Sequence, residues 1–268
     1  MHAGQVHVDV NMARALIAEQ FPHWSARPVQ GVQTTGTMNA IFRIGEDLAA
    51  RFPLLTSDPA VARAALVAET EAAREFAQAS PIPTPEPVVL GQPGRGYPLP
   101  WVIQTWIPGH DATIEDPAHS TAFAQDLAAL ITALRSVETK ERHFDGSGRG
   151  GHLTDHDEWL AADTMCHRDL TPPNVLVDGG RLVGILDAGA FGPADPALDL
   201  VVAWHLLDEE ARHLLRTTLG CSDIQWERGI AWAFQQAMGL VWYYIESNPT
   251  MSRWGLRTLD RIVASGVA

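Results

Sequence analysis

Residues 166–177, CHRDLTPPNVLV, and residues 182–189, LVGILDAG, decide the fold of this chain. The first stretch predicts a polar loop followed by a short strand, and the second predicts another apolar strand that ends in a carboxylate. The glycines between the two stretches predict a tight turn, so the strands form a hairpin. The side chains of Asp169, Asn174 and Asp187 are thereby held on connections at the ends of short apolar strands.

These three side chains suit phosphoryl transfer. One carboxylate, Asp169, orients a nucleophilic hydroxyl, while the amide of Asn174 and the carboxylate of Asp187 hold Mg²⁺. The spacing matches the catalytic loop H-R-D-x-x-x-x-N and the metal-binding D-x-G of kinase-like enzymes. The alternative is a β-hairpin with incidental polar ends, which we disfavour because His167 and Gly189 also fall in register.

The same residues, followed by residues 195–200, DPALDL, resemble the aminoglycoside phosphotransferase family of antibiotic kinases. Protein kinases would show D-F-G and then A-P-E, whereas this chain has D-A-G at residues 187–189 and no A-P-E. Arg168 departs in the other direction, because the antibiotic kinases commonly have glycine there. The resemblance also implies that Asp199 braces the catalytic loop through its backbone amides.

The resemblance implies an α+β, two-lobed protein-kinase-like fold. Residues 1–108 would form the N-terminal nucleotide-binding lobe, an antiparallel sheet plus one main helix, and residues 109–268 the mostly helical lobe for catalysis and acceptor binding. Patterning predicts strands at 29–33, 40–44, 48–52, 88–90 and 101–107. It predicts helices at 9–21, 58–79, 117–137, 155–162, 196–207, 209–219, 224–246 and 250–264, with only helices after Asp187 and with the aromatic residues of 224–246 in the core.

Charge is distributed unevenly along the chain. Residues 1–108 contain 7 basic and 9 acidic side chains, and residues 109–268 contain 12 and 23. An acidic second half repels nucleic acid and membrane phosphate and attracts a small cationic molecule. We expect neither nucleic acid nor membrane as a partner; general acidity for solubility is the plainer alternative. The two cysteines predict no disulfide or metal framework, and the absence of a leader or a membrane span predicts a cytoplasmic protein.

Lys140 is the only lysine in the chain, so the cation for a nucleotide phosphate must be an arginine. By resemblance, Arg51 takes the place of the lysine that binds the α- and β-phosphates. Glu69 or Glu71 in the following helix pairs with it, and we favour Glu69 because of its distance to the proline-rich break at residues 81–85. The small polar loop of residues 34–39, with Thr35, Gly36 and Asn39, lets backbone amides approach phosphates. An ordinary hairpin and an edge-strand arginine with an exposed tip are the alternatives.

The segment from residue 104 to 109 resembles the hinge between the lobes of kinase-like enzymes. The backbone at Gln104, Trp106 and Ile107 would then bond the adenine edge, although a central apolar strand would have the same sequence pattern. Almost nothing lies between Trp159 and His167, where members of the family have a further helical segment. We therefore expect a wide acceptor side.

The predicted reaction is transfer of the γ-phosphoryl of ATP or GTP, with Mg²⁺, to a hydroxyl of a small cationic molecule, most simply an aminoglycoside-type antibiotic, which implies antibiotic resistance. One alternative is a kinase of a small metabolite such as an amino alcohol, a sugar or a fructosamine-like compound. Another is a nucleotide-binding pseudo-enzyme with an impaired acceptor site. The sequence does not predict the oligomeric state.

Overall fold

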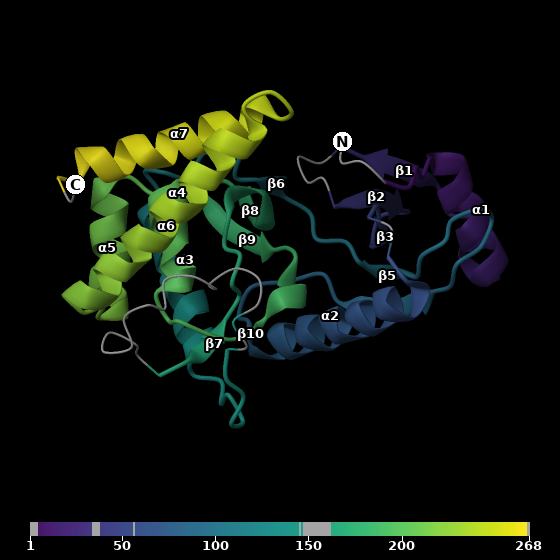
Figure 1. Ribbon diagram of the computed structural model, residues 1–268, viewed down its shortest axis with the longest axis horizontal. Coiled ribbons are helices and arrows are strands. Elements are labelled where there is room, and N and C mark those ends of the chain that lie inside the picture. The colour runs from purple at the N-terminus through teal and green to yellow at the C-terminus, as the bar shows by residue number, and fades with distance from the viewer. Residues whose placement is uncertain (1–4, 34–37, 56, 145, 147–161, 267–268) are drawn as a thin grey trace. The chain divides into compact units, whose positions relative to one another are not determined.

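The chain folds into two units of different secondary structure. A computed structural model describes residues 5–33, 38–55, 57–144, 146 and 162–266 (Figure 1). Unit 1 comprises Met1–Arg74 and Thr84–Ile107, and unit 2 comprises Glu75–Pro83 and Pro108–Ala268.

Unit 1 is built on one antiparallel sheet with the strand order β1-β2-β3-β5-β4. Its strands are β1 (Val29–Val32), β2 (Asn39–Ile44), β3 (Leu48–Pro53), β4 (Pro87–Gly91) and β5 (Trp101–Thr105). This confirms the predicted antiparallel sheet. The end of the last strand was predicted two residues too late: the Trp106 amide already donates to the carbonyl of Asp47, at 2.8 Å, outside any strand.

The helices of unit 1 begin where their capping residues predict. Helix α1 (Val10–Gln20) starts after Asp9, whose carboxylate accepts the Met12 amide at 2.8 Å. Helix α2 (Pro59–Ala79) starts after Asp58, whose Oδ1 accepts the Ala60 amide at 2.9 Å. A short 3₁₀ helix, η1 (Pro22–Trp24), links α1 to the sheet. Both predicted helices are confirmed.

The core of unit 1 centres on stacked aromatic rings. Phe52 and Trp101 lie with centroids 4.6 Å apart and planes inclined by 18°, and Tyr97 meets Phe52 edge-on at 5.2 Å. All three are essentially excluded from solvent. Gly91 on the neighbouring strand lies so close that an added Cβ would be 2.0 Å from the Trp101 ring, so this position requires glycine.

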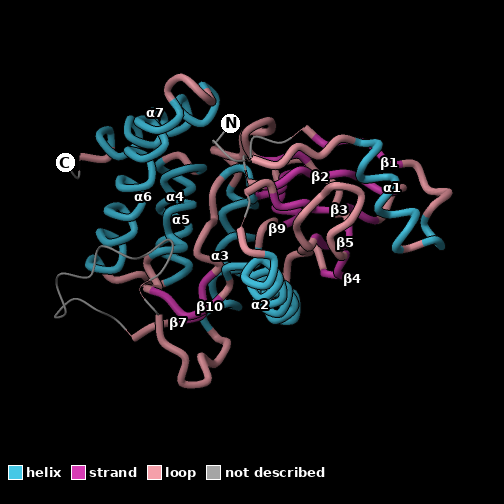
Figure 2. The backbone as a smooth tube through the Cα atoms, turned by 45° about the vertical axis from the view of Figure 1, so that its right-hand side comes forward, coloured by secondary structure: helices cyan, strands magenta, loops and turns pink. Residues whose placement is uncertain are grey.

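Unit 2 is mostly helical and contains two small antiparallel sheets, one with the order β6-β8-β9 and one pairing β10 with β7 (Figures 1 and 2). Its strands are β6 (His110–Asp111), β7 (Thr164–Cys166), β8 (Val175–Asp178), β9 (Arg181–Ile185) and β10 (Gly192–Ala194). Its helices are α3 (Thr121–Arg135), α4 (Val201–Leu206), α5 (Glu209–Leu219), α6 (Asp223–Tyr244) and α7 (Pro249–Ala264), with short 3₁₀ helices η3 (Pro172–Asn174), η4 (Ala188–Ala190) and η5 (Leu198–Leu200).

The predicted hairpin after the catalytic loop is confirmed. β8 and β9 pair antiparallel, with Asp178 opposite Arg181, and the turn between them is Gly179-Gly180. Both glycines have positive φ, 56° and 72°, which a two-residue hairpin turn requires. Together with the sheet of unit 1 and the helices of unit 2, this confirms the predicted α+β fold class.

The prediction of nothing but helix after Asp187 was wrong. Residues 192–194 form β10, which pairs antiparallel with β7, the strand directly before the loop of residues 167–174; Gly192 lies opposite Cys166. The sequence Gly-Pro-Ala has no strand propensity, so the pairing arises from tertiary structure. The predicted helix at 155–162 lies, apart from its last residue, outside the described residues.

The prediction that the aromatic residues of 224–246 form core was only partly right. Trp226 and Trp232 are buried, but Trp242 is 84% exposed and Tyr243 is 58% exposed. Helix α6 packs on α7, α4 and η5, and these contacts leave Trp242 and Tyr243, at its C-terminal end, exposed. No described helix is long and apolar enough to cross a membrane.

An ion pair between α3 and β9 gives a prediction for the pH dependence of stability. Asp126 accepts two hydrogen bonds from Arg181, each 2.7 Å, and these bonds lower the pKa of the carboxyl below its usual value of 3.8. A depressed pKa stabilises the folded state above pH 3.8, and this contribution disappears as the pH falls through the folded pKa. Arg181→Gln should therefore lower the urea midpoint at pH 7, and this loss should become smaller as the pH falls below 3.8.

Arg216→Gln is the matched control, because Arg216 pairs with Asp223, whose side chain is 87% exposed. Its urea midpoint should stay close to that of the unmodified chain at both pH values. An equal loss for Arg181→Gln at pH 3 and pH 7 would contradict the assigned role of Asp126.

Candidate active site

The loop before β8 is fixed by a buried carboxylate. Asp199, in η5 and only 2% exposed, accepts the His167 amide at 2.8 Å and the Arg168 amide at 2.9 Å. Burial raises the pKa of Asp199, whereas these two amides and the charges of nearby basic groups act in the opposite direction. The expectation that Asp199 braces the loop is confirmed.

His167 joins the loop to the end of β9. It is fully buried, its Nε2 lies 3.0 Å from the Leu186 carbonyl oxygen, and its Nδ1 accepts the Asp169 amide at 3.2 Å. A carbonyl can only accept, so Nε2 bears the hydrogen and Nδ1 is the acceptor. The Phe76 ring meets the imidazole edge-on at 5.3 Å. The histidine therefore positions the backbone of Asp169 and lies away from solvent.

The side chain of Asn174 is oriented by the same loop. Its Nδ2 donates to the backbone carbonyl of Asp169 at 3.0 Å, and the backbone carbonyl of Asn174 accepts the Leu186 amide at 2.8 Å. The Thr171 hydroxyl donates to Asp169 Oδ1 at 3.2 Å. The loop thus brings Asp169 and Asn174 into direct contact, and the β8–β9 pairing places the residue before Asp187 against Asn174.

Two residues of the site adopt left-handed backbone conformations that side chains other than glycine rarely take. Asp187 has φ 58° and Arg168 has φ 73°. Aspartate tolerates this region, but an arginine there is strained, and such strain often accompanies functional sites. The Arg168 guanidinium lies over the Phe144 ring at 4.9 Å. The exposed Asp187 carboxylate stands at the start of η4.

The donor set fits a divalent cation. Because Nδ2 of Asn174 is bound to the loop, the oxygen Oδ1 faces the other way and accepts no hydrogen bond from a described residue. An amide oxygen and an exposed carboxylate at adjoining positions are ligands that suit Mg²⁺. No group of three His, Cys, Asp or Glu side chains that could hold a metal occurs among the described residues. A metal at this site would therefore have few protein ligands, as Mg²⁺ bound to phosphates does.

In unit 1, Arg51 on β3 pairs with Glu69 on α2, through Nη2 and Oε2. The expected pairing is confirmed, and the choice of Glu69 over Glu71 is right. The arginine side chain is 14% exposed and that of the glutamate 43%. Asn39 begins β2 and is half-buried, whereas Thr35 and Gly36 lie outside the described residues.

The three residues predicted to recognise adenine lie at and beyond the end of β5. Gln104 is inside the strand, between β3 and β4, with Ala49 and Pro87 as its register partners. The Trp106 amide is already bound to Asp47. Ile107 makes no backbone hydrogen bond to any described residue, so its N–H can donate to a ligand and its carbonyl can accept from one.

His167 and Thr171 are the contacts that sequence reasoning did not assign. The position of His167 in the loop motif indicated that it belongs to the site. Its role in positioning the loop could not be predicted, because it depends on a hydrogen bond to the Leu186 carbonyl, 19 residues away. Nothing in the sequence pattern pointed to Thr171.

Comparison with known proteins agrees with this geometry. Fold and loop together define a kinase-type phosphotransferase of small molecules. The model of the APH phosphotransferase enzyme family matches residues 24–165 and 152–230, and the chain belongs to this family. No curated protein sequence matched the chain.

Solved structures show the same kinase-like fold at low sequence identity. The GDP complex of aminoglycoside 2'-phosphotransferase-IIIa is 17% identical, with a TM-score of 0.71 over 97% of this chain and 100% of that one. The streptomycin–ATP ternary complex of APH(2")-IIa is 16% identical, with a TM-score of 0.61 over 91% and 96%. Macrolide 2'-phosphotransferase MphH from Brachybacterium faecium is 15% identical, with a TM-score of 0.58 over 86% and 91%.

Removing the charge of Asp199 tests how the loop is held. In Asp199→Asn the side chain keeps one acceptor oxygen, so one of the two loop amides loses its partner. We expect a stability loss of roughly 1–3 kcal/mol by urea denaturation, together with at least tenfold slower nucleotide turnover. Asp223→Asn, an exposed position, should change neither. A variant at Asp199 with unchanged turnover would contradict the bracing role.

Proposed function

We propose that this phosphotransferase moves the γ-phosphoryl of ATP or GTP to a hydroxyl of a small cationic molecule of the aminoglycoside type. The observation that supports this most directly is the contact of Asn174 Nδ2 with the Asp169 carbonyl, at 3.0 Å, on a loop braced by Asp199. This contact orients an acid–base group and a metal ligand together. We assign nucleotide binding to residues 1–108 and catalysis with acceptor binding to residues 109–268.

Asp169 is proposed to orient the acceptor hydroxyl and to take its proton. The hydroxyl oxygen forms a bond to the γ-phosphorus in line with the bond that breaks, and the nucleoside diphosphate leaves with the bridging oxygen. The Thr171 hydroxyl donates to Asp169 Oδ1, which fixes the carboxylate, and the acceptor hydroxyl would bind at the other carboxylate oxygen. Positioning of this kind supplies much of the rate enhancement in phosphoryl transfer.

Asn174 Oδ1 and the Asp187 carboxylate are the proposed ligands of Mg²⁺. When bound, the ion neutralises charge on the phosphate oxygens. Asp187 directly follows Leu186, whose amide donates to the backbone carbonyl of Asn174, so the two proposed ligands lie on adjoining segments of the chain.

The proposed contacts of unit 1 concern the nucleotide. Arg51, held by Glu69, would bind the α- and β-phosphates, and backbone amides around Thr35, Gly36 and Asn39 would approach them. The adenine edge would bond the backbone from Gln104 through Trp106 to Ile107. Since the Trp106 amide is bound to Asp47, the Ile107 amide is the better donor.

The acidity of residues 109–268 supports a cationic acceptor, and several similar structures are antibiotic kinases. Macrolides, which also contain an amine, form a second candidate class because macrolide 2'-phosphotransferases share the fold. A role in antibiotic resistance would follow from either class.

Nucleotide consumption across a panel of aminoglycosides, macrolides and small amino alcohols tests the proposal. We expect at least one antibiotic to raise consumption above the acceptor-free rate. Asp169→Ala should lower this turnover by roughly 10² to 10⁴-fold, the contribution of a positioned acid–base group, with nucleotide affinity nearly unchanged. Full turnover in Asp169→Ala would exclude Asp169 as the acid–base group. If only amino alcohols stimulate consumption, the acceptor is an amino alcohol and not an aminoglycoside.

The metal ligands are tested by titrating Mg²⁺ against nucleotide binding. Asp187→Asn should raise the Mg²⁺ concentration needed for half-maximal binding by at least tenfold, because a charged ligand is lost. Asp178→Asn, an exposed carboxylate in the same hairpin, is the matched control and should behave as the unmodified chain does. If both variants respond alike, Asp187 is not a ligand.

A further inference from the structure

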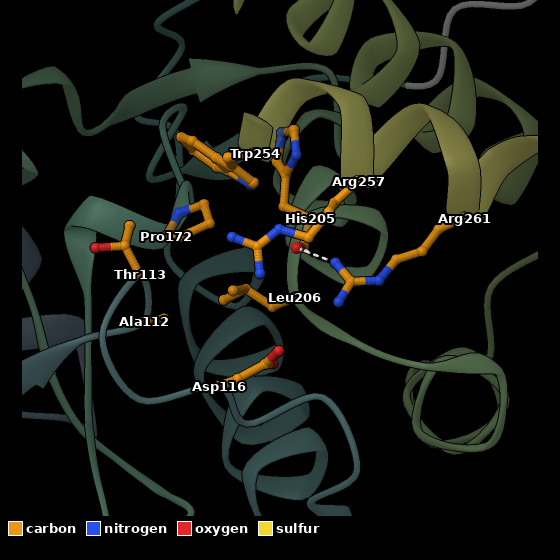
Figure 3. Close-up of a pocket in the computed structure, with 9 residues that line it drawn as sticks. All are labelled: Ala112, Thr113, Asp116, Pro172, His205, Leu206, Trp254, Arg257 and Arg261. Atoms are coloured by element: carbon orange, nitrogen blue, oxygen red, sulfur yellow. Dashed lines mark hydrogen bonds between the residues drawn. The ribbon is translucent and has the colours of Figure 1, made fainter. Parts of the chain in front are cut away.

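Unit 2 contains a pocket beside the catalytic loop that the proposed reaction does not use (Figure 3). Helix α7 provides one side, and the segment after β6 and helix α4 provide the others. The residues that matter to its chemistry are Asp116, Pro172, His205, Trp254, Arg257 and Arg261.

The pocket adjoins the loop directly. Pro172 forms part of its wall, and the Pro172 carbonyl accepts the amide of Ala112, another wall residue, at 3.1 Å. Pro172 is three residues from Asp169, so their Cα atoms are at most roughly 11 Å apart. A small compound bound in the pocket is therefore long enough to reach the proposed acid–base group, Asp169.

Two guanidinium groups make the pocket basic. The Arg257 side chain is exposed and its guanidinium extends into the middle of the pocket, below Trp254 (Figure 3). In the described part of the chain it has no hydrogen bond or ion pair. The Arg261 guanidinium donates to the His205 carbonyl and keeps further N–H groups available.

The charge of the residues that line the pocket is opposite to that of the surrounding sequence, because one carboxylate, Asp116, stands against the guanidinium groups of Arg257 and Arg261. Burial lowers the pKa of Arg261; the carboxylates of Asp116 and of Asp208, outside the pocket, oppose this, and the positive charge of Arg257 adds to it. Arg257 and Arg261 are also four residues apart on α7, a spacing at which like charges destabilise a helix.

A buried donor in the pocket wall lacks a partner. Trp254 is 4% exposed, and its Nε1–H makes no hydrogen bond to any described residue. A buried N–H without an acceptor is destabilising, so such groups are usually satisfied by water or a ligand. The wall thus has one unsatisfied donor, the Trp254 N–H, near the exposed Arg257 guanidinium, and the group that would satisfy this donor is an acceptor.

We propose that this pocket binds an oxyanion, a carboxylate or phosphate group. A guanidinium binds both groups through paired N–H donors, and the indole N–H supplies a neutral donor. The anion is either free, as inorganic phosphate is, or part of a small molecule whose hydroxyl lies at the loop. This inference does not depend on the proposed phosphoryl transfer, because binding is measurable without turnover.

Isothermal titration with inorganic phosphate and with acetate, at constant ionic strength, tests the site. The chain should bind phosphate saturably, and Arg257→Gln should weaken binding at least tenfold. Trp254→Phe, which keeps an aromatic ring but removes the N–H, should weaken it severalfold. Arg253→Gln is the matched control, one turn earlier on α7 and outside the pocket, and should bind as the unmodified chain does.

Phosphate can also bind at the proposed nucleotide site, so Arg51→Gln serves as a second control. This variant alters the nucleotide site and should still bind phosphate in the pocket of unit 2, whereas Arg257→Gln should not. Equal binding by Arg257→Gln and Arg253→Gln, or no saturable binding of either anion, would overturn the proposal. In turnover assays, phosphate is tested as a competitor of the acceptor. Competition that occurs in the unmodified chain and disappears in Arg257→Gln would show that the pocket binds an anionic group of the acceptor. Phosphate binding without such competition would identify a free anion.

Discussion

The loop of residues 167–174 depends on the carboxylate of Asp199, which accepts the amides of His167 and Arg168 in the interior of unit 2. Removing a carboxylate from water costs several kcal/mol, and hydrogen bonds to a charged group each contribute about 1.5–3 kcal/mol. Both amides are therefore needed to offset its burial. This requirement couples the loop to η5, about 30 residues later, and through His167 to the end of β9. Asp169 and Asn174 thus have defined positions although they lie on a loop.

The parts of the fold that the sequence predicts well are local. The β8–β9 hairpin follows from Gly179-Gly180, and α1 starts where Asp9 can cap it, because turns and caps depend on neighbouring residues. The pairing of Arg51 with Glu69 was predicted from the family resemblance and from the distance of Glu69 to the proline-rich break at residues 81–85. β10 was not, since Gly-Pro-Ala forms a strand only against β7. The placement of the aromatic side chains of α6 likewise depends on which face α7 covers.

Average charge and local charge differ in unit 2. Residues 109–268 are strongly acidic, which supports attraction of cations at a distance. At contact distance the helix α7 presents arginines to the pocket beside Pro172. Long-range attraction depends on the sum of charges, whereas recognition depends on the few groups that lose water on binding. A sequence count can therefore suggest what approaches the protein but not which groups each site binds.

The uneven burial of the tryptophans affects how unfolding can be followed by tryptophan fluorescence. Trp101, Trp204 and Trp232 are within the core, whereas Trp242 is mostly exposed on α6. An indole in water emits at longer wavelength than one in an apolar interior, and a soluble quencher reaches it more easily. The native emission should therefore already contain a red-shifted, quenchable component. Spectral position alone would then underestimate the change on unfolding, and replacing Trp242 by phenylalanine would yield a cleaner optical signal.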